Sequence, residues 1–155
     1  MLPSTSSFSL WVKPLHPSIK ALDIPLRRQT AGSAGVDLHS TAEVILHPQD
    51  RLAIHTGVAI WLEYSSLMGL IAIRSSWGKK GLVLQNSVGI IDSDYQGELL
   101  LQVMNLSPHL IHIPAMTRIA QLIVVQILPI TANLIVEEFP ERTSRATGGF
   151  GSTGN

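Results

Sequence analysis

Cysteine is absent from this chain of 155 residues. Its absence excludes disulfide bonds, thiolate chemistry and cysteine-ligated zinc. Charged residues are also scarce, at 14% of the chain, and the 11 basic residues balance the 11 acidic ones. No sequence-wide positive field therefore attracts nucleic acid, and we expect no direct nucleic-acid binding. A small protein so poor in charge would expose apolar patches, so we expect sister subunits to cover part of its surface.

Long apolar runs and targeting signals are missing as well. No stretch reaches the roughly 18–20 apolar residues that a membrane helix needs. Residues 1–12 have neither the basic start nor the apolar core of a secretory signal. We therefore expect a protein of the cytoplasm or the nucleus that is neither secreted nor bound to a membrane.

Short β-branched runs separated by turn-forming residues dominate what is present. Such runs at spacings of about 8–12 residues are typical of an all-β sandwich or barrel, and only Ser75–Lys80 resembles a short helical turn. The predicted strands are Leu10–Lys13, Val36–His39, Glu43–Leu46, Arg51–His55, Val58–Leu62, Gly69–Ile73, Leu82–Gln85, Glu98–Asn105, Leu110–Ile113, Ile119–Leu128 and Leu134–Glu138.

The run Ile119–Leu128 is apolar on both faces of the predicted strand, apart from Gln121. Side chains alternate along a strand, so both faces need cover, from a second sheet or from a neighbouring subunit. Gln121 needs a polar partner, which is either a neighbouring backbone group or a ligand.

Three polar segments lie at predicted strand ends. The turn around Asp92 and Tyr95 carries carboxylates that suit either an Asx-turn or a general base beside a sugar. Arg74-Ser75-Ser76 suits either an ordinary helix N-cap or a phosphate site. Asp37 is a turn carboxylate or a metal ligand. The six histidines show no ligand spacing, and we interpret them as structural.

The segment Arg145–Asn155 combines four glycines, hydroxyl side chains, one arginine and Phe150. Alone it has too little apolar surface to offset the entropy of ordering, so a disordered tail is one interpretation. Its parts also suit a phosphate and a flat ring, because glycine backbones, hydroxyls and arginine all donate to anions. A lid that orders over a nucleotide is the other interpretation.

Five segments, taken together and in this order, resemble the motifs of the trimeric all-β dUTP nucleotidohydrolase (dUTPase) family. The resemblance runs from about Val12 to the end of the chain, and its third and fifth segments are highly specific. The stretch from Arg74 to Lys80 and the proline-rich start also look like retrovirus-derived members. The five segments are Ala34–Leu38, Arg74–Ser76, Val88–Glu98, Arg118–Leu122 and Arg145–Gly154.

The resemblance implies both a fold and an activity. The fold would be a jelly-roll-like β-sandwich or distorted barrel over residues 1–140, followed by a flexible arm over residues 141–155 that closes the active site. Three subunits would share each site, so the partners are dUTP, dUMP and two further copies of the chain. The activity would be hydrolysis of dUTP to dUMP and pyrophosphate by water attack on the α-phosphorus, assisted by Mg²⁺. A virion location would follow if the source were retroviral.

The resemblance also implies residue roles. Asp92 would deprotonate the attacking water, Tyr95 would pack under the deoxyribose, and Asp37 would contact Mg²⁺ through water. The remaining substrate-binding residues are Asn86, Gly89 and Ile91 at the uracil, Arg74, Ser75, Ser76 and Gln121 at the phosphates, and Arg145, Gly149, Phe150, Gly151, Ser152 and Thr153 in the arm.

Some positions depart from the family. Ser76 and Ala146 stand where glycine is usual, and Trp77 stands where a smaller residue is common, which would suit a subunit interface. Related dCTP deaminases share Arg-Ser-Ser but need a catalytic glutamate near the position of Gln102, so deamination is the weaker enzyme hypothesis. A dUTPase-like module acting by protein–protein contact is the other alternative.

Overall fold

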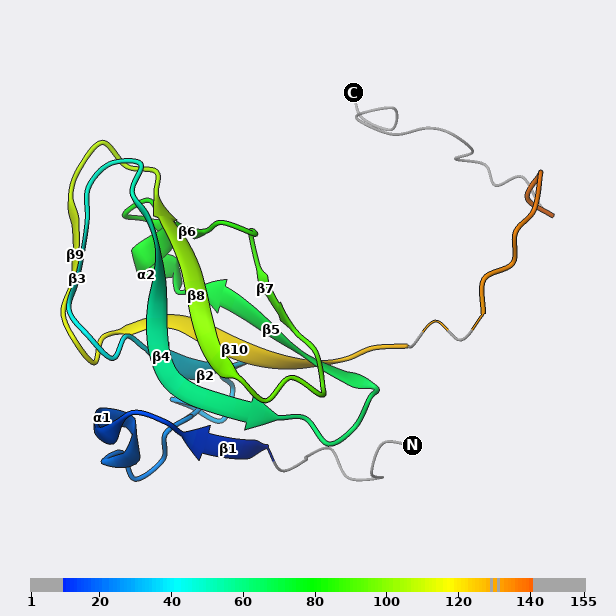
Figure 1. Cartoon of the computed structure of the whole chain (residues 1–155), viewed down its shortest axis with the longest axis horizontal. Coiled ribbons are helices and arrows are strands. Elements are labelled where there is room, and N and C mark those ends of the chain that lie inside the picture. The colour runs from blue at the N-terminus through cyan, green and yellow to red at the C-terminus, as the bar shows by residue number, and fades with distance from the viewer. Residues whose placement is uncertain (1–9, 129, 131, 141–155) are drawn as a thin grey trace.

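The chain folds into two four-stranded antiparallel sheets that pack face to face, with a two-stranded ribbon at one end (Figure 1). The computed structural model describes residues 10–128, 130 and 132–140. In chain order the elements are β1 (Trp11–Pro14), α1 (Pro17–Lys20), β2 (Val36–His39), β3 (Val44–Leu46), β4 (Arg51–Trp61), β5 (Leu67–Ile73), α2 (Ser75–Gly78), β6 (Leu82–Leu84), β7 (Gly89–Ile91), β8 (Glu98–Asn105), β9 (Ile111–Ile113) and β10 (Arg118–Gln126).

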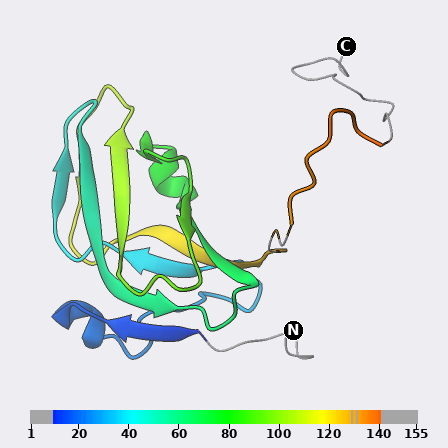
Figure 2. The same cartoon turned by 45° about the vertical axis from the view of Figure 1, so that its right-hand side comes forward.

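One sheet has the strand order β1-β4-β8-β6, and the other has the order β2-β10-β5-β7. Figure 2 shows the two layers with β1 and α1 along one side. In β8, Leu99, Leu101 and Val103 point inward and are at most 1% exposed, while alternate residues face outward. This period of two is the pattern of a strand with one buried face. Together with core side chains from β2, β5 and β10, it confirms the predicted all-β sandwich.

The strand β4 differs from its prediction, because the sequence indicated two strands separated by a turn at Thr56-Gly57. The structure has one strand that bends there, with a register shift against β8 between His55 and Ala59. Gly57 has a φ of +67°, a conformation that glycine adopts without strain. A Cβ at this position would collide with His16 and Thr41. The turn residues therefore form a bulge inside a long strand.

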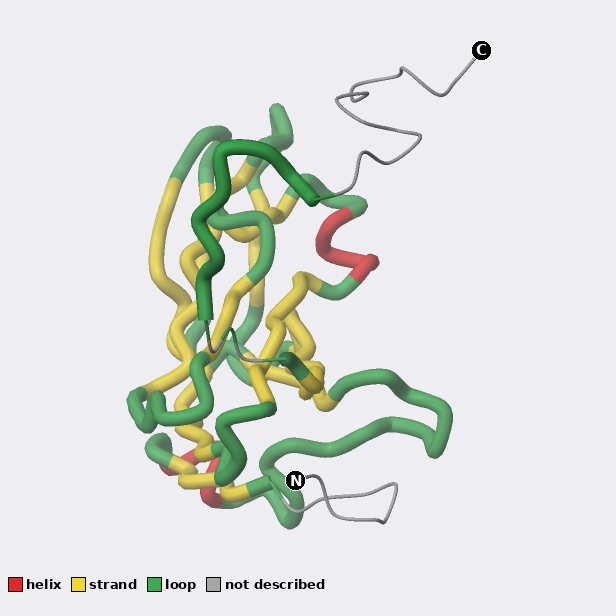
Figure 3. The backbone as a smooth tube through the Cα atoms, turned by 90° about the vertical axis from the view of Figure 1, so that its right-hand side faces the viewer, coloured by secondary structure: helices red, strands yellow, loops and turns green. Residues whose placement is uncertain are grey.

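Three smaller elements also depart from the predictions. The helix α1 and the strand β7 were not predicted, and they have four and three residues. Figure 3 shows helix, in red, as a small part of the backbone beside strand and loop. The predicted strand Leu134–Glu138 is irregular, and residues 132–140 run away from the sandwich (Figure 1). Leu134 and Ile135 are 90% and 98% exposed. A strand needs a neighbouring strand to pair with, and none of the described residues of this chain pairs with the segment.

The described part of the chain contains two helices of four residues each. Within the described residues, no helix is long and apolar enough to cross a membrane.

Candidate active site

Three of the sequence segments meet on adjacent strands of one sheet. Asp37 lies on β2, and its partner in register is Gln121 on the central strand β10. On its other side Gln121 pairs with Ala72 of β5, two residues before Arg74. The Arg74 N–H donates to the Ile119 carbonyl at 2.9 Å, which fixes the end of β5 against the start of β10. The structure thus brings the predicted phosphate-binding residues Arg74 and Gln121 beside Asp37.

Asp37 holds two arginines. Its side chain is 10% exposed, and its two oxygens accept from Nη1 of Arg74 at 2.5 Å and from Nη1 of Arg118 at 3.4 Å. A buried carboxylate with two cationic donors is charge-compensated, and each guanidinium keeps further N–H groups for an anion. Arg118 was not among the predicted site residues, although it opens the fourth segment of the resemblance.

His39, opposite Arg118 in the register of β2 and β10, has a lowered pKa. Burial disfavours its charged form and is the largest cause, the arginines Arg118 and Arg74 lower the pKa further, and Asp37 opposes the shift. The imidazole is therefore neutral at pH 7, and the positive charge of this region belongs to the two guanidinium groups.

Ser75 and Ser76 begin α2 and are exposed. The N-cap position is Arg74, and its side chain makes no capping hydrogen bond. The serines therefore do not serve as the ordinary N-cap that the sequence left open. Their hydroxyls lie next to the arginine that Asp37 holds.

Trp77 is 7% exposed and belongs to the core of its own subunit. Its Nε1–H donates to the Arg118 carbonyl at 3.1 Å. The expectation that Trp77 lines a subunit interface is therefore wrong for this side chain.

The predicted uracil-reading residues surround a pocket of about 180 Å³ between β7 and β8. The hairpin before β7 has a tight turn, in which the Ser87 N–H donates to the Leu84 carbonyl and Ser87 has a φ of 65°. Asn86 and Gln102 are the polar residues that line this pocket, and Gly89 and Ile91 line it together with other hydrophobic side chains. A pocket with a few polar groups in an apolar wall is typical of small-molecule recognition.

Asp92 follows β7 directly and is exposed. The next residues form a turn in which the Tyr95 N–H donates to the Asp92 carbonyl at 3.2 Å. The Tyr95 hydroxyl donates to the Glu98 carbonyl at 3.0 Å, so the ring folds back over Gly97. A Cβ at Gly97 would collide with the Tyr95 ring and hydroxyl. Glycine at this position therefore lets the exposed tyrosine ring lie over the backbone of Gly97.

The predicted phosphate-binding residues around Arg74 and the predicted general base Asp92 lie at opposite ends of β5. Ile91 pairs with Gly69, which places Asp92 level with Met68. Arg74 stands six residues further along β5 than Met68, a separation of about 20 Å at roughly 3.3 Å per residue. A general base and a phosphate ligand in one reaction must lie within a few ångströms of the same substrate atoms. Within one chain, Asp92 and Arg74 therefore lie too far apart along β5 to act on the same phosphate.

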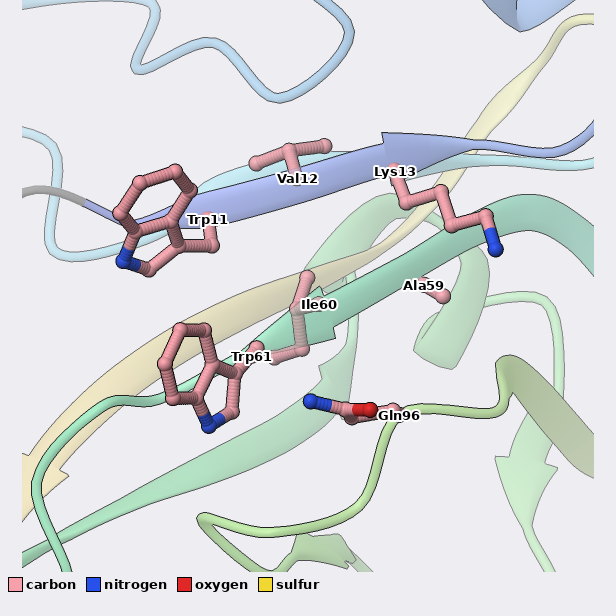
Figure 4. Close-up of a pocket in the computed structure, with 7 residues that line it drawn as sticks. All are labelled: Trp11, Val12, Lys13, Ala59, Ile60, Trp61 and Gln96. Carbon is pink, nitrogen blue, oxygen red and sulfur yellow. The ribbon is translucent and has the colours of Figure 1, made fainter.

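A second pocket, of about 270 Å³, lies along the edge strand β1 (Figure 4). Trp11 and Trp61 are opposite each other in the register of β1 and β4, and their ring centroids are 5.9 Å apart. Such cross-strand aromatic pairs stabilise a sheet edge. Gln96, next to Tyr95, closes the other side of this pocket.

The described residues contain no group of three or more His, Cys, Asp or Glu side chains that would hold a metal ion. Asp37, the predicted contact to Mg²⁺ through water, already accepts from two arginines with both oxygens. This carboxylate therefore fits an arginine clamp better than a metal ligand, and a metal ion here would depend on oxygens from the substrate.

The arm residues predicted to close the site, Arg145, Gly149, Phe150, Gly151, Ser152 and Thr153, lie outside the described residues.

Comparison with known proteins agrees with this geometry. The family model described as dUTPase matches residues 22–154. The chain belongs to the dUTPase family. A protein of Francisella philomiragia named deoxyuridine 5'-triphosphate nucleotidohydrolase is 49% identical over 129 residues, which are 81% of this chain and 86% of the relative. A protein of the same name from Aromatoleum aromaticum is 43% identical over 144 residues, 88% of this chain and 95% of the relative.

Solved structures give the same assignment. The dUTPase of Staphylococcus bacteriophage 80alpha, solved with dUpNHpp, superposes with a TM-score of 0.84 at 28% identity. The superposition covers 96% of this chain and 100% of the phage chain. The dUTPase of phage phi11 of S. aureus superposes with a TM-score of 0.76 at 25% identity over 86% of this chain, and that structure concerns a structural Mg(II) ion. These dUTPase relatives are bacterial and phage proteins, so the predicted retroviral origin is not supported.

Proposed function

We propose that this dUTPase family member hydrolyses dUTP to dUMP and pyrophosphate, as a homotrimer whose active sites are shared between subunits. The observation that carries the proposal is the division of the site. The predicted site residues in the described part of the chain fall into two sets, one at the Asp37 clamp and one at the β7 pocket and the turn after it, where Asp92 lies about 20 Å along β5 from Arg74. Association of copies brings the β7 end of one subunit to the clamp of another.

The pocket at β7 suits uracil. Backbone groups of the hairpin and the Asn86 amide offer donors and acceptors, which discriminate strongly because a mismatched base leaves buried polar groups unpaired. Gln102 faces the same pocket, and its amide does not exchange protons at neutral pH as a catalytic glutamate would. Its presence favours binding of the base over deamination.

The chemistry follows from the charges. Asp92 takes a proton from water while the water oxygen forms a bond to the α-phosphorus. The bond from that phosphorus to its bridging oxygen breaks, and pyrophosphate leaves with the electron pair. Arg74 and Arg118 supply fixed positive charge, and Ser75 and Ser76 supply hydroxyl donors. Preorganised donors around a polyanion are the main source of rate enhancement for such a reaction.

Because Asp37 is occupied by arginines, the phosphate oxygens of the substrate would hold Mg²⁺ in this proposal. When bound, it neutralises phosphate charge and fixes the phosphate oxygens in space.

The arm forms the third part of the site. We assign residues 1–140 to the β domain and residues 141–155 to a flexible arm that places Phe150 on uracil and Arg145, Ser152 and Thr153 around the γ-phosphate, with Gly149 and Gly151 allowing close approach of the backbone. The exposed Leu134 and Ile135 just before it suit contact with a neighbouring subunit, which carries the arm to that subunit's site.

Release of pyrophosphate from dUTP, UTP, dCTP and dTTP with Mg²⁺ tests the activity. We expect turnover confined to dUTP. Ammonia release from dCTP, or no turnover with any of the four, would contradict the proposal.

Complementation tests the shared site. Asp92→Asn and Arg74→Gln each inactivate every site of their own homotrimer. Co-expressed in equal amounts, they form trimers of which about three quarters are mixed, and about a quarter of all sites take both intact residues from different subunits. We expect about a quarter of the wild-type activity. Activity that stays at the level of the single variants would mean that Asp92 and Arg74 of one site come from the same chain.

A further inference from the structure

Trp77 connects the two segments that carry Arg74 and Arg118, the arginines proposed to bind the phosphates. It lies on α2, three residues after Arg74, and its Nε1–H donates to the Arg118 carbonyl at 3.1 Å. The Arg74 N–H donates to the Ile119 carbonyl at 2.9 Å. Two hydrogen bonds, one at each end of the first turn of α2, therefore fix this helix to the first two residues of β10.

The indole itself is held on more than one side. Trp77 is 7% exposed and packs in the core cluster, and the Lys80 ammonium lies 4.1 Å from the ring centroid. A cation over an indole is an attractive contact. The ring is rigid, with only two side-chain torsions, and burial and the Lys80 contact restrict both.

An apolar residue would fill this space without a hydrogen bond. Tryptophan brings a buried N–H that must find an acceptor, and the acceptor is the backbone of Arg118, one of the two arginines that Asp37 holds. Arg118 is therefore held twice: its side chain contacts Asp37, and its backbone carbonyl accepts from Trp77.

We propose that Trp77 is a positioning residue for the triphosphate: its indole N–H holds α2 and β10 in the register at which Arg74 and Arg118 face the same anion. This inference rests on the proposed dUTP hydrolysis. It also gives a role to the tryptophan that stands where the family commonly has a smaller residue, because a smaller aliphatic side chain has no N–H to donate to Arg118. Small displacements of groups that orient a substrate reduce rates by large factors.

Trp77→Phe tests the hydrogen bond, because it keeps an aromatic ring in the core and over Lys80 and removes the donor. Trp11→Phe is the matched control, since Trp11 is 57% exposed on the edge strand β1. For each protein, the affinities for deoxyuridine and for dUpNHpp are measured by calorimetry, with kcat and KM for dUTP. Deoxyuridine reports the pocket at β7 alone, and the triphosphate analogue reports both parts of the site.

We expect Trp77→Phe to bind dUpNHpp about 3- to 10-fold more weakly, from the loss of one hydrogen bond, and to lower kcat/KM at least as much. Its affinity for deoxyuridine should stay within about twofold of wild type, because no residue that lines the base pocket belongs to α2 or β10. Trp77→Leu, which also removes the ring, should show a larger loss of the same selective kind. Trp11→Phe should match the wild type in all three measurements.

Equal affinities and kcat/KM in Trp77→Phe and wild type would overturn the inference, as would parallel losses for deoxyuridine and dUpNHpp, which indicate general loosening of the fold. Turnover by the wild type separates the two hypotheses. An active wild type with an unchanged Trp77→Phe variant contradicts the role of Trp77 alone, whereas a wild type that releases no pyrophosphate from dUTP contradicts the proposed function as well.

Discussion

Replacing Asp37 by asparagine tests whether this carboxylate serves the fold or a metal ion. Asp37→Asn keeps the size and shape of the side chain and removes its charge. Arg74 and Arg118 then lose their common counter-charge and repel each other. If Asp37 acts as an arginine clamp, the stability of the free protein falls whether or not Mg²⁺ is present.

The size of the loss follows from the burial of the three groups. Breaking a fully buried ion pair costs about 3–5 kcal/mol, and breaking an exposed one costs at most about 1 kcal/mol. The Asp37 side chain is 10% exposed, whereas those of Arg74 and Arg118 are 31% and 45% exposed and keep part of their hydration. The cost should therefore lie between these limits, at about 2–3 kcal/mol, which lowers the Tm of a domain of this size by about 4–12 °C.

Thermal unfolding by circular dichroism, at one protein concentration and with either EDTA or Mg²⁺, measures this loss. Asp23→Asn is the control, because Asp23 is an exposed carboxylate in the loop after α1. We expect the same decrease for Asp37→Asn in both buffers and no decrease for Asp23→Asn. The clamp is refuted if Asp37→Asn unfolds within about 1 °C of the control in EDTA and differs from the wild type only when Mg²⁺ is added.

Three further predictions concern the other parts of the site. Asp92→Asn should bind dUpNHpp like the wild type and lose about 10²- to 10⁴-fold in kcat; single-turnover assays decide this, and full activity would reject Asp92 as the base. Gly97→Ala should displace Tyr95 and reduce the preference for dUTP over UTP about tenfold or more, as competing-substrate assays will show, and an unchanged preference would mean that Tyr95 does not exclude the 2′-OH. For His39, whose pKa is lowered mainly by burial, the unfolded state binds the proton more readily, so stability should fall as the pH drops below about 6.5. Chemical denaturation at pH 7.5 and 5.5 should show a smaller fall for His39→Gln, and an equal fall would exclude His39 as the cause.

Much of the fold was predictable because its signals are local. The alternation in Glu98–Asn105 and the turn residues between short apolar runs each depend on neighbours in sequence, and the structure has strands at these places. The fold class follows from many such signals together. The motifs around Asp92 and Arg74 are local patterns too, and the catalytic and phosphate-binding roles that they imply stay predictions.

Signals that depend on distant residues were not predictable. Gly57 indicated a turn, and only its contacts with His16 and Thr41 show that β4 continues through a bulge. The segment Leu134–Glu138 has the composition of a strand, but composition does not supply a pairing partner. The resemblance implied that Asp37 contacts Mg²⁺ through water, and no local pattern indicated its two arginines, which lie 37 and 81 residues further along the chain.

The division of the site along β5 connects the composition of the chain with its proposed activity. In the proposed trimer, the clamp at one end of β5 and Asp92 at the other end each meet a neighbouring copy to complete a site. Such contacts cover surface that a monomer would expose, including Ile90 at 55% and Leu100 at 41% beside the base pocket. Charged side chains are costly to bury without partners. The proposed trimer, in which the catalytic residues lie at subunit contacts, therefore concentrates its few charges in the sites, which agrees with a charged content of only 14%.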